Sequence, residues 1–116
     1  MKAIAVETYY PDDQYIKDDS GNFVKDDDGK KQLKDDAKGY RVKALESIQF
    51  TEVMLDGFQE RGGDRVMTFP GIKLLLKYGL ESYQAEMASM PSAHHVEVAR
   101  YIFTKSSLAE HERKNS

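Results

Sequence analysis

The sequence predicts a single α+β domain, in which a β-hairpin or small antiparallel sheet near the N-terminus is followed by three to four α-helices. Three observations support this fold class. Two segments before residue 46 alternate between apolar and polar residues, which is typical of strands. After Ser47 the apolar residues recur at helical spacing, so the chain is expected to be mainly helical. A length of 116 residues suits one modest hydrophobic core.

The two strands are expected at residues 1–10 and 40–45. In the first, β-branched and aromatic residues recur at alternate positions until Pro11 ends the extended segment. The second alternates in the same way and has Tyr40 and Val42 on its apolar side. They are expected to belong to the β-hairpin or small antiparallel sheet, and the sequence leaves open whether its strands pair within one chain or between chains.

An acidic region between the strands contains three Lys-Asp-Asp triplets, which begin at Lys17, Lys25 and Lys34. Turn-forming Asp, Ser and Gly residues separate its short apolar pieces. The triplet spacing is too irregular to indicate a solenoid repeat. We therefore expect a hairpin with one mobile, charged arm.

The acidic residues that precede Gly29 invite comparison with a calcium-binding loop. An EF-hand loop needs an oxygen ligand at its first position and glycine at its sixth. Counting back from Gly29 places Val24 first, and counting back from Gly21 places Ile16 first. Neither side chain can bind a cation, so solvated turns are predicted here.

Ser47 is expected to cap the clearest amphipathic helix of the chain, over residues 48–61. Acidic and amide residues occupy one side of this helix. The other side is apolar and carries Ile48, Phe50, Met54, Leu55 and Phe58. A pair of glycines at positions 62 and 63 is expected to end the helix.

The stretch from residue 68 to residue 83, TFPGIKLLLKYGLESY, has the densest run of large apolar residues. Pro70 can open a helix there and Gly79 can close it. Lys73 and Lys77 share one narrow stripe, and apolar side chains cover most of the remaining surface. So short a helix is not stable alone in water, so its apolar surface must contact other helices or another protein.

Two further helices are expected over residues 80–90 and 93–108, with a break at Pro91. The polar residues 110–116 are predicted to fray. The chain is therefore expected to form one domain over residues 1–116. Its strands and acidic arm occupy residues 1–45, and its helices occupy residues 46–109.

Composition narrows the classes of partner. The net charge is −3, and all of this excess lies in the first 39 residues, where seven Lys face ten Asp or Glu. Nucleic acid would require a basic field, so DNA and RNA are not expected partners. The chain has no Cys, no signal-peptide pattern and no apolar run of the roughly 20 residues that a membrane helix needs. A cytoplasmic location without a membrane partner is expected.

No motif for catalysis is found. The Gly62-Gly63 pair lacks the Lys and Ser or Thr of a phosphate loop, and the carboxylates lie in turns where nothing would raise their pKa. The adjacent His94 and His95 point about 100° apart on a helix and cannot hold one ion together. His95 is expected on the apolar side, partly buried and hydrogen-bonded. We predict no enzyme, no metal site and no cofactor.

Aromatic and apolar side chains at helical spacing belong either to a core or to an adaptable protein-binding surface. The central helix and its neighbours hold the best candidates for both roles. The candidate protein-binding or core residues, between whose roles the sequence does not choose, are Leu75, Tyr78, Leu80, Tyr83 and Phe103.

Residues 74–80, LLLKYGL, are followed by Tyr83 and resemble a segment of the tail assembly chaperones of long-tailed bacteriophages. That segment has a leucine-rich helix, Tyr-Gly-Leu and then an aromatic residue. Residues 40–54, YRVKALESIQFTEVM, look like the extended piece and first helix that precede it. The resemblance covers residues 40–108 and leaves the acidic arm without a counterpart.

This resemblance implies a non-enzymatic helper in the cytoplasm of the infected host cell. Proteins of this family coat the tape-measure protein until the tail tube assembles around it, and they are absent from the mature virion. The implied partners are the tape-measure protein, other tail proteins and further copies of the chain in a homo-oligomer. The family often also has a longer form made by ribosomal frameshifting.

Two alternatives remain open at this stage. A small acidic phage or bacterial inhibitor would bind a host defence or polymerase component through the acidic arm, residues 12–36. A metal-assisted enzyme would instead use the three histidines, His94, His95 and His111.

Overall fold

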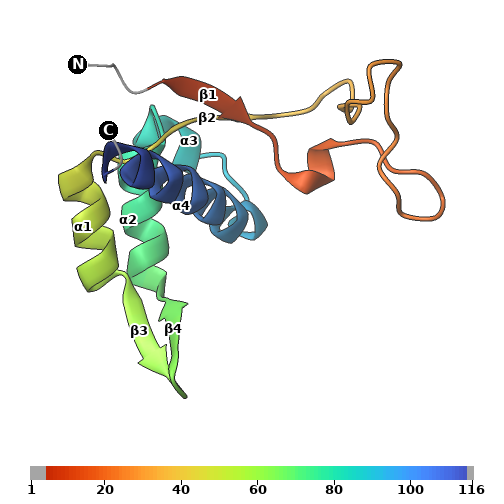
Figure 1. Cartoon of the computed structure of the whole chain (residues 1–116). Helices are drawn as coiled ribbons and strands as arrows, with labels where there is room; N and C mark the ends of the chain where they lie inside the picture. Colours follow the sequence, from red (N-terminus) through yellow and green to blue (C-terminus); the bar gives the residue numbers. More distant parts are fainter. Residues whose placement is uncertain (1–4, 115–116) are drawn as a thin grey trace.

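The computed structural model describes residues 5–114, which form an α+β fold as predicted (Figure 1). Its two sheets are antiparallel pairs, β1 with β2 and β3 with β4. A 3-10 turn at Asp12–Gln14 follows β1. The helices and strands of the described residues are β1 (Val6–Tyr9), β2 (Tyr40–Lys43), α1 (Ser47–Asp56), β3 (Phe58–Arg61), β4 (Asp64–Met67), α2 (Phe69–Gly79), α3 (Tyr83–Met87) and α4 (Ser92–Lys114).

The β1–β2 sheet confirms both predicted strands, although residues 1–4 of the first lie outside the described residues. Its register places Tyr9 opposite Tyr40. The alternation in β2 is as expected, because Tyr40 and Val42 are both fully buried. Tyr9 stacks on Tyr101 of α4 with ring centroids 4.3 Å apart. The sheet therefore packs against α4.

Residues 15–38 form a ring of three turns, which extends away from the helices in Figure 1. Three backbone hydrogen bonds close the ring. Ile16 N donates to Gln32 O at 2.8 Å, Gln32 N to Val24 O at 2.9 Å, and Val24 N to Ile16 O at 3.0 Å. These three residues are therefore equivalent, at a regular interval of eight positions. In place of the one predicted hairpin, the segment contains two small antiparallel turns, with Lys17 opposite Phe23 and Lys25 opposite Lys31.

Aspartate side chains shape the first two turns of this ring identically. Oδ1 of Asp18 and Oδ1 of Asp26 each accept from the backbone N–H groups two and four residues later, all at 2.9 Å. Lys34 stands at the equivalent position of the third turn. In the third turn Oε1 of Gln14 replaces the aspartate oxygen as acceptor and accepts from Lys38 N at 2.9 Å. The Lys-Asp-Asp triplets do not show this period of eight, because the third triplet begins nine residues after the second.

α1 begins with a capping box, in which Gln49 Oε1 accepts from Glu46 N at 3.0 Å, rather than at the predicted serine cap. It ends at Gly57, and the residues expected as its last turn form β3 instead. The predicted helix to residue 61 is wrong because the glycine pair makes a hairpin turn. Gly62 and Gly63 have φ angles of 57° and 89°, which suit a two-residue hairpin loop.

The side of α1 that faces the core also differs from the prediction. Val53 is fully buried, and Phe50 is partly buried and stacks on Phe103 of α4. Ile48 and Leu55 are each 75% exposed. Apolar residues surround more than half of this helix, so only some of them can meet α2 and α4.

α2 contributes to the centre of the core, as predicted. Leu75 and Leu76 are buried, whereas Lys73 and Lys77 form its exposed stripe. The core extends from β2 through α1 and α2 to α4. Its buried residues are Tyr40, Val42, Leu45, Val53, Leu75, Leu76, Leu80, Met90, Val98, Ala99 and Ile102.

Two glycines of α2 let neighbouring elements approach closely. A methyl group at Gly71 would overlap the backbone of Gly57 at the end of α1. A methyl group at Gly79 would overlap the side chain of Ile102 in α4. Both α1 and α4 therefore pack against α2 at glycine positions where there is no room for a side-chain methyl group.

α4 continues through Lys114, so residues 110–114 are helical and the predicted frayed tail is wrong over that range. Arg113 holds this end against α1, because its guanidinium donates to Ser47 Oγ at 3.0 Å and to Leu45 O at 3.1 Å. Glu110 Oε2 accepts from the same guanidinium at 2.7 Å. Within residues 5–114, no helix combines the length and apolar character needed to cross a membrane.

Replacing Gly71 with Ala is expected to lower the free energy of unfolding by about 2–3 kcal/mol, because the new methyl group would force two backbones apart. The midpoint of urea unfolding, followed by circular dichroism, measures this change. Lys73→Ala on the exposed stripe of the same helix is the control and should change stability by less than about 0.5 kcal/mol. Equal stability of the two variants would contradict the close approach of α1 and α2.

Candidate functional site

The five candidate residues lie in or against the core. Leu75 and Leu80 are buried. Tyr78, Tyr83 and Phe103 are partly buried and pack against the core cluster. The structure thus gives all five a core role and leaves Leu75 and Leu80 with almost no surface for a partner.

Two of these aromatic side chains also join helices. The Tyr78 hydroxyl of α2 donates to Glu52 Oε1 of α1 at 2.6 Å, and this hydrogen bond raises the pKa of Tyr78. The ring of Phe103 lies 5.8 Å from that of Phe50 and 5.3 Å from that of Phe58. Both contacts fix α1 and the β3–β4 hairpin relative to α2 and α4.

Other apolar side chains supply the accessible surface. Phe69 at the start of α2 is 77% exposed, and Leu108 on α4 is 62% exposed. Together with Ile48 and Leu55 they form what we call the exposed apolar set. Sequence patterns did not predict that these four side chains are exposed, because a helical wheel does not show which part of a wide apolar arc the neighbouring helices cover.

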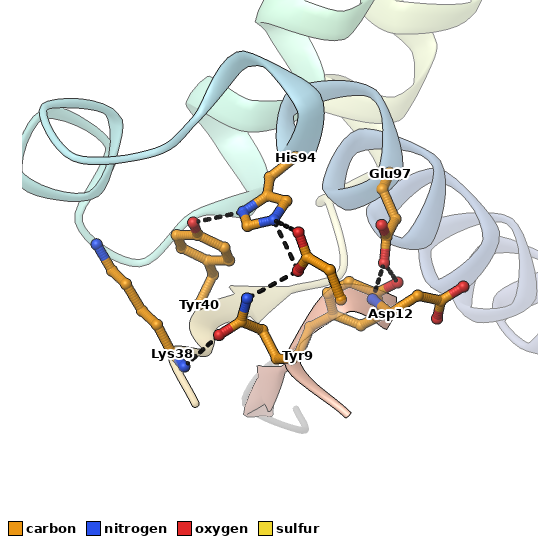
Figure 2. Close-up of polar contacts among 8 residues, drawn as sticks. Tyr9, Asp12, Lys38, Tyr40, His94 and Glu97 are labelled. Carbon is orange, nitrogen blue, oxygen red and sulfur yellow. Dashed lines mark hydrogen bonds and ion pairs between the residues drawn. The ribbon is translucent and has the colours of Figure 1, made fainter. Parts of the chain in front are cut away.

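A polar cluster, in which Tyr40 and His94 are buried and Asp13 is exposed, joins the acidic arm to the helices (Figure 2). The Tyr40 hydroxyl lies 3.0 Å from His94 Nδ1. His94 Nε2 lies 3.0 Å and 2.9 Å from the two carboxylate oxygens of Asp13. The cluster continues outward, since Gln14 Nε2 donates to Asp13 Oδ1 at 2.7 Å and Gln14 Oε1 accepts from Lys38 N. One line of hydrogen bonds thus runs from α4 into the third turn of the ring.

The geometry of this cluster is that of a structural link. A single tautomer of neutral His94 satisfies it, with Nδ1 accepting from Tyr40 and Nε2 donating to Asp13. Hydrogen bonds from Gln14 and His94 hold the pKa of Asp13 below its usual value. Tyr40 is fully buried and His94 is nearly so, which leaves no space for a substrate beside the imidazole. Burial raises the pKa of Tyr40, which favours the neutral phenol that the link needs.

The prediction for the histidine pair is confirmed in part. His95 is partly buried as expected, but its Nε2 has no hydrogen-bond partner within residues 5–114. His94, which was not expected in the interior, is the buried and hydrogen-bonded member. Tyr40 of β2 and Asp13 at the base of the arm cover the first turn of α4 on the His94 side. A helical wheel of α4 alone does not include these two elements.

A second link joins β1 to α4 beside the first. Glu97 Oε2 accepts from the Tyr9 hydroxyl at 2.6 Å and from Asp12 N at 2.8 Å. Burial and the bond to Glu97 raise the pKa of Tyr9 above its ordinary value. An open hollow of about 520 Å³ lies here and is lined in part by Val96 and Arg100. Its walls combine apolar and polar side chains, and the carboxylate of Glu97 there is already bonded to the Tyr9 hydroxyl and to Asp12 N.

Acidic residues of the arm do not converge on a common point. Among the described residues, no group of three or more His, Cys, Asp or Glu side chains is arranged to hold a metal ion. Asp18 and Asp26 are instead bonded to the backbone of their own turns. The turns are therefore stabilised by local hydrogen bonds.

Asp13→Asn is expected to loosen the arm, because one amide oxygen replaces two carboxylate acceptors facing His94. The folded pKa of Asp13 is lowered, so its link is complete above the ordinary value of about 4 and is lost as the pH falls through the folded pKa. The ¹⁵N order parameters of residues 15–38 should therefore fall in the variant at pH 7, and in the unsubstituted protein as the pH falls through the lowered pKa of Asp13.

Asp19→Asn, an exposed change in the same arm, is the matched control and should leave those order parameters unchanged. An arm that stays equally ordered in the Asp13 variant would show that the Asp13–His94 link does not position it. The helices should keep their order in all three proteins, because the core contains no group from the ring.

No known family model, curated protein or solved structure matches the chain.

Proposed function

We propose that the chain is a non-enzymatic tail assembly chaperone of a long-tailed bacteriophage. It binds the tape-measure protein and associates with itself through apolar helical surfaces while the tail assembles. The observation that carries this proposal is the exposed apolar set, Ile48, Leu55, Phe69 and Leu108, each more than 60% exposed beside a well-filled core. The exposed apolar set supports a binding protein in general, and the resemblance of the central segment to the chaperone family suggests a tail assembly chaperone in particular.

The size of the exposed surface suits reversible binding. Full burial of one large apolar side chain contributes about 1.5–3 kcal/mol. A few such side chains give a useful affinity once the cost of association is subtracted, without making the complex permanent. A chaperone has to release its client when the tail tube takes its place, so moderate affinity fits the role.

The fold also explains why a binding role is favoured over catalysis. The buried Tyr40 and His94 are engaged with each other and with the exposed carboxylate of Asp13, and these contacts hold the arm. In the open hollow beside α4, Glu97 is likewise engaged, with the Tyr9 hydroxyl and Asp12 N. In this proposal the protein acts in the host cytoplasm, contacts neither nucleic acid nor membrane, and leaves before the virion is complete.

A second candidate is an acidic inhibitor of a host defence or polymerase component. The observation that favours it is the ring of residues 15–38, whose seven acidic side chains are all exposed on turns that hydrogen bonds stabilise. Replacing residues 15–37 with a short Gly-Ser linker separates the two candidates. An inhibitor would lose its target, whereas a chaperone would keep its client.

Light scattering after size-exclusion chromatography tests the chaperone proposal with a purified helical fragment of a tape-measure protein. We expect a complex whose mass exceeds the sum of one copy of each partner. Replacing the exposed apolar set with Ser should weaken binding at least about tenfold, because each loss removes apolar surface from the contact. The fold should survive, since these side chains are outside the core.

Gln84→Ser with Thr104→Ser, two exposed polar changes, is the matched control and should bind the fragment normally. A strict monomer that ignores the fragment would contradict the proposal. So would a serine-substituted protein that binds the fragment as tightly as the unsubstituted chain.

A further inference from the structure

Charged residues are sharply divided between the two neighbouring helices α1 and α2. The segment from residue 44 to residue 60, which contains α1, has four acidic residues and no basic one. The segment from residue 65 to residue 80, which contains α2, has three basic residues and no acidic one. Each segment also exposes large apolar side chains. The chain therefore presents two apolar surfaces of opposite charge.

We define the α1 ridge as Ile48, Thr51, Leu55 and Asp56, all of which are exposed. Ile48 and Leu55 are seven positions apart and so lie on the same side of the helix, with Thr51 between them. Asp56 adds a negative charge at the end of the ridge. Nothing within residues 5–114 covers the two apolar side chains, which are each 75% exposed.

We define the α2 ridge as Phe69, Lys73 and Lys77. These residues are four positions apart in sequence, lie along one line of the helix and are all exposed. A hollow of about 300 Å³ lies beside Phe69 and is also lined by Val66 and Arg61 of the hairpin. The α2 ridge is thus apolar at one end and positively charged along its length.

The charges of the two ridges are not neutralised inside the chain. None of the ion pairs formed within residues 5–114 includes Asp56, Lys73 or Lys77. The ridges are also matched in length, because α1 has 10 residues and α2 has 11. The α1 ridge and the α2 ridge are therefore similar in length and opposite in charge, so each is complementary to the other.

We propose that the partner is a second copy of this chain, whose α2 ridge docks on the α1 ridge of the first. Ile48 and Leu55 of one copy then cover Phe69 of the other, and Lys73 and Lys77 approach Asp56 at the end of the α1 ridge. Opposite charge favours this pairing over α1 on α1 or α2 on α2, because like charges placed together in an interface are unfavourable.

The contact joins unlike surfaces and so leaves one ridge free on each copy of the first pair. Further copies can add until the assembly closes into a ring or extends as a filament. The inference rests on the proposed function for its role, since such an array could line a long client. The contact itself is a property of the chain alone and is measured without any client.

Sedimentation velocity over a range of protein concentrations tests the contact. The unsubstituted chain should self-associate, and less strongly at high salt. Lys73→Glu with Lys77→Glu should weaken self-association at least about tenfold, because like charges replace opposite ones. Thr51→Lys with Asp56→Lys should weaken it in the same way from the other side. The four positions are exposed, so circular dichroism should show unchanged folding.

The decisive measurement mixes the two charge-reversed proteins in equal amounts. Their altered ridges are complementary again, so the mixture should associate although neither protein does so alone. Lys25→Glu with Lys30→Glu changes the net charge equally within the acidic arm and serves as the control for Lys73 and Lys77. That control protein should self-associate like the unsubstituted chain.

Ile48→Ser with Leu55→Ser tests the apolar part of the contact and should also prevent self-association, whereas Leu108→Ser on α4 should not. A chain that stays monomeric at millimolar concentration would overturn the inference. So would charge-reversed proteins that self-associate normally, or a mixture that fails to associate. Self-association without binding to a tape-measure fragment would overturn the proposed function and leave this contact standing.

Discussion

The close packing of α2 against α1 and α4 is the constraint on which the rest of the structure depends. Gly71 lets α2 approach the end of α1, and Gly79 lets Ile102 of α4 fit against the helix backbone. Between these two positions the leucines of α2 complete the core together with β2. Because both approaches use glycine, the helices cannot rotate to bury different side chains without losing the fit.

This constraint decides which apolar residues stay outside. With α2 and α4 fixed, only one side of α1 can meet the core, and Val53 occupies it. Ile48 and Leu55 then lie in water although they belong to the same amphipathic helix. The surplus apolar surface is therefore a result of helix geometry, and it falls on the segment whose charges are all negative. Apolar character and charge together make α1 a candidate contact surface.

Patterns along the chain predicted what depends on local periodicity. The β1–β2 pair, the exposed lysine stripe of α2 and the buried leucines beside it agree with the structure. The predictions were wrong where contacts between segments distant in sequence determine the local structure. Burial of His94 depends on Tyr40 and Asp13, and the last turn of α4 depends on Arg113 reaching α1. The hairpin at residues 58–67 depends on two positive φ angles that a helix stop would also allow.

The acidic arm shows how one such long-range link can organise a segment of low hydrophobicity. Its three turns have few apolar side chains, and local hydrogen bonds to Asp18 and Asp26 replace a core. Such a ring could adopt many orientations if only its two chain ends held it. Gln14 changes this, because one side chain completes the third turn and also bonds Asp13, which in turn contacts His94. The orientation of the arm is thus determined from the helical core outward, so a partner that contacts both would meet them as one surface.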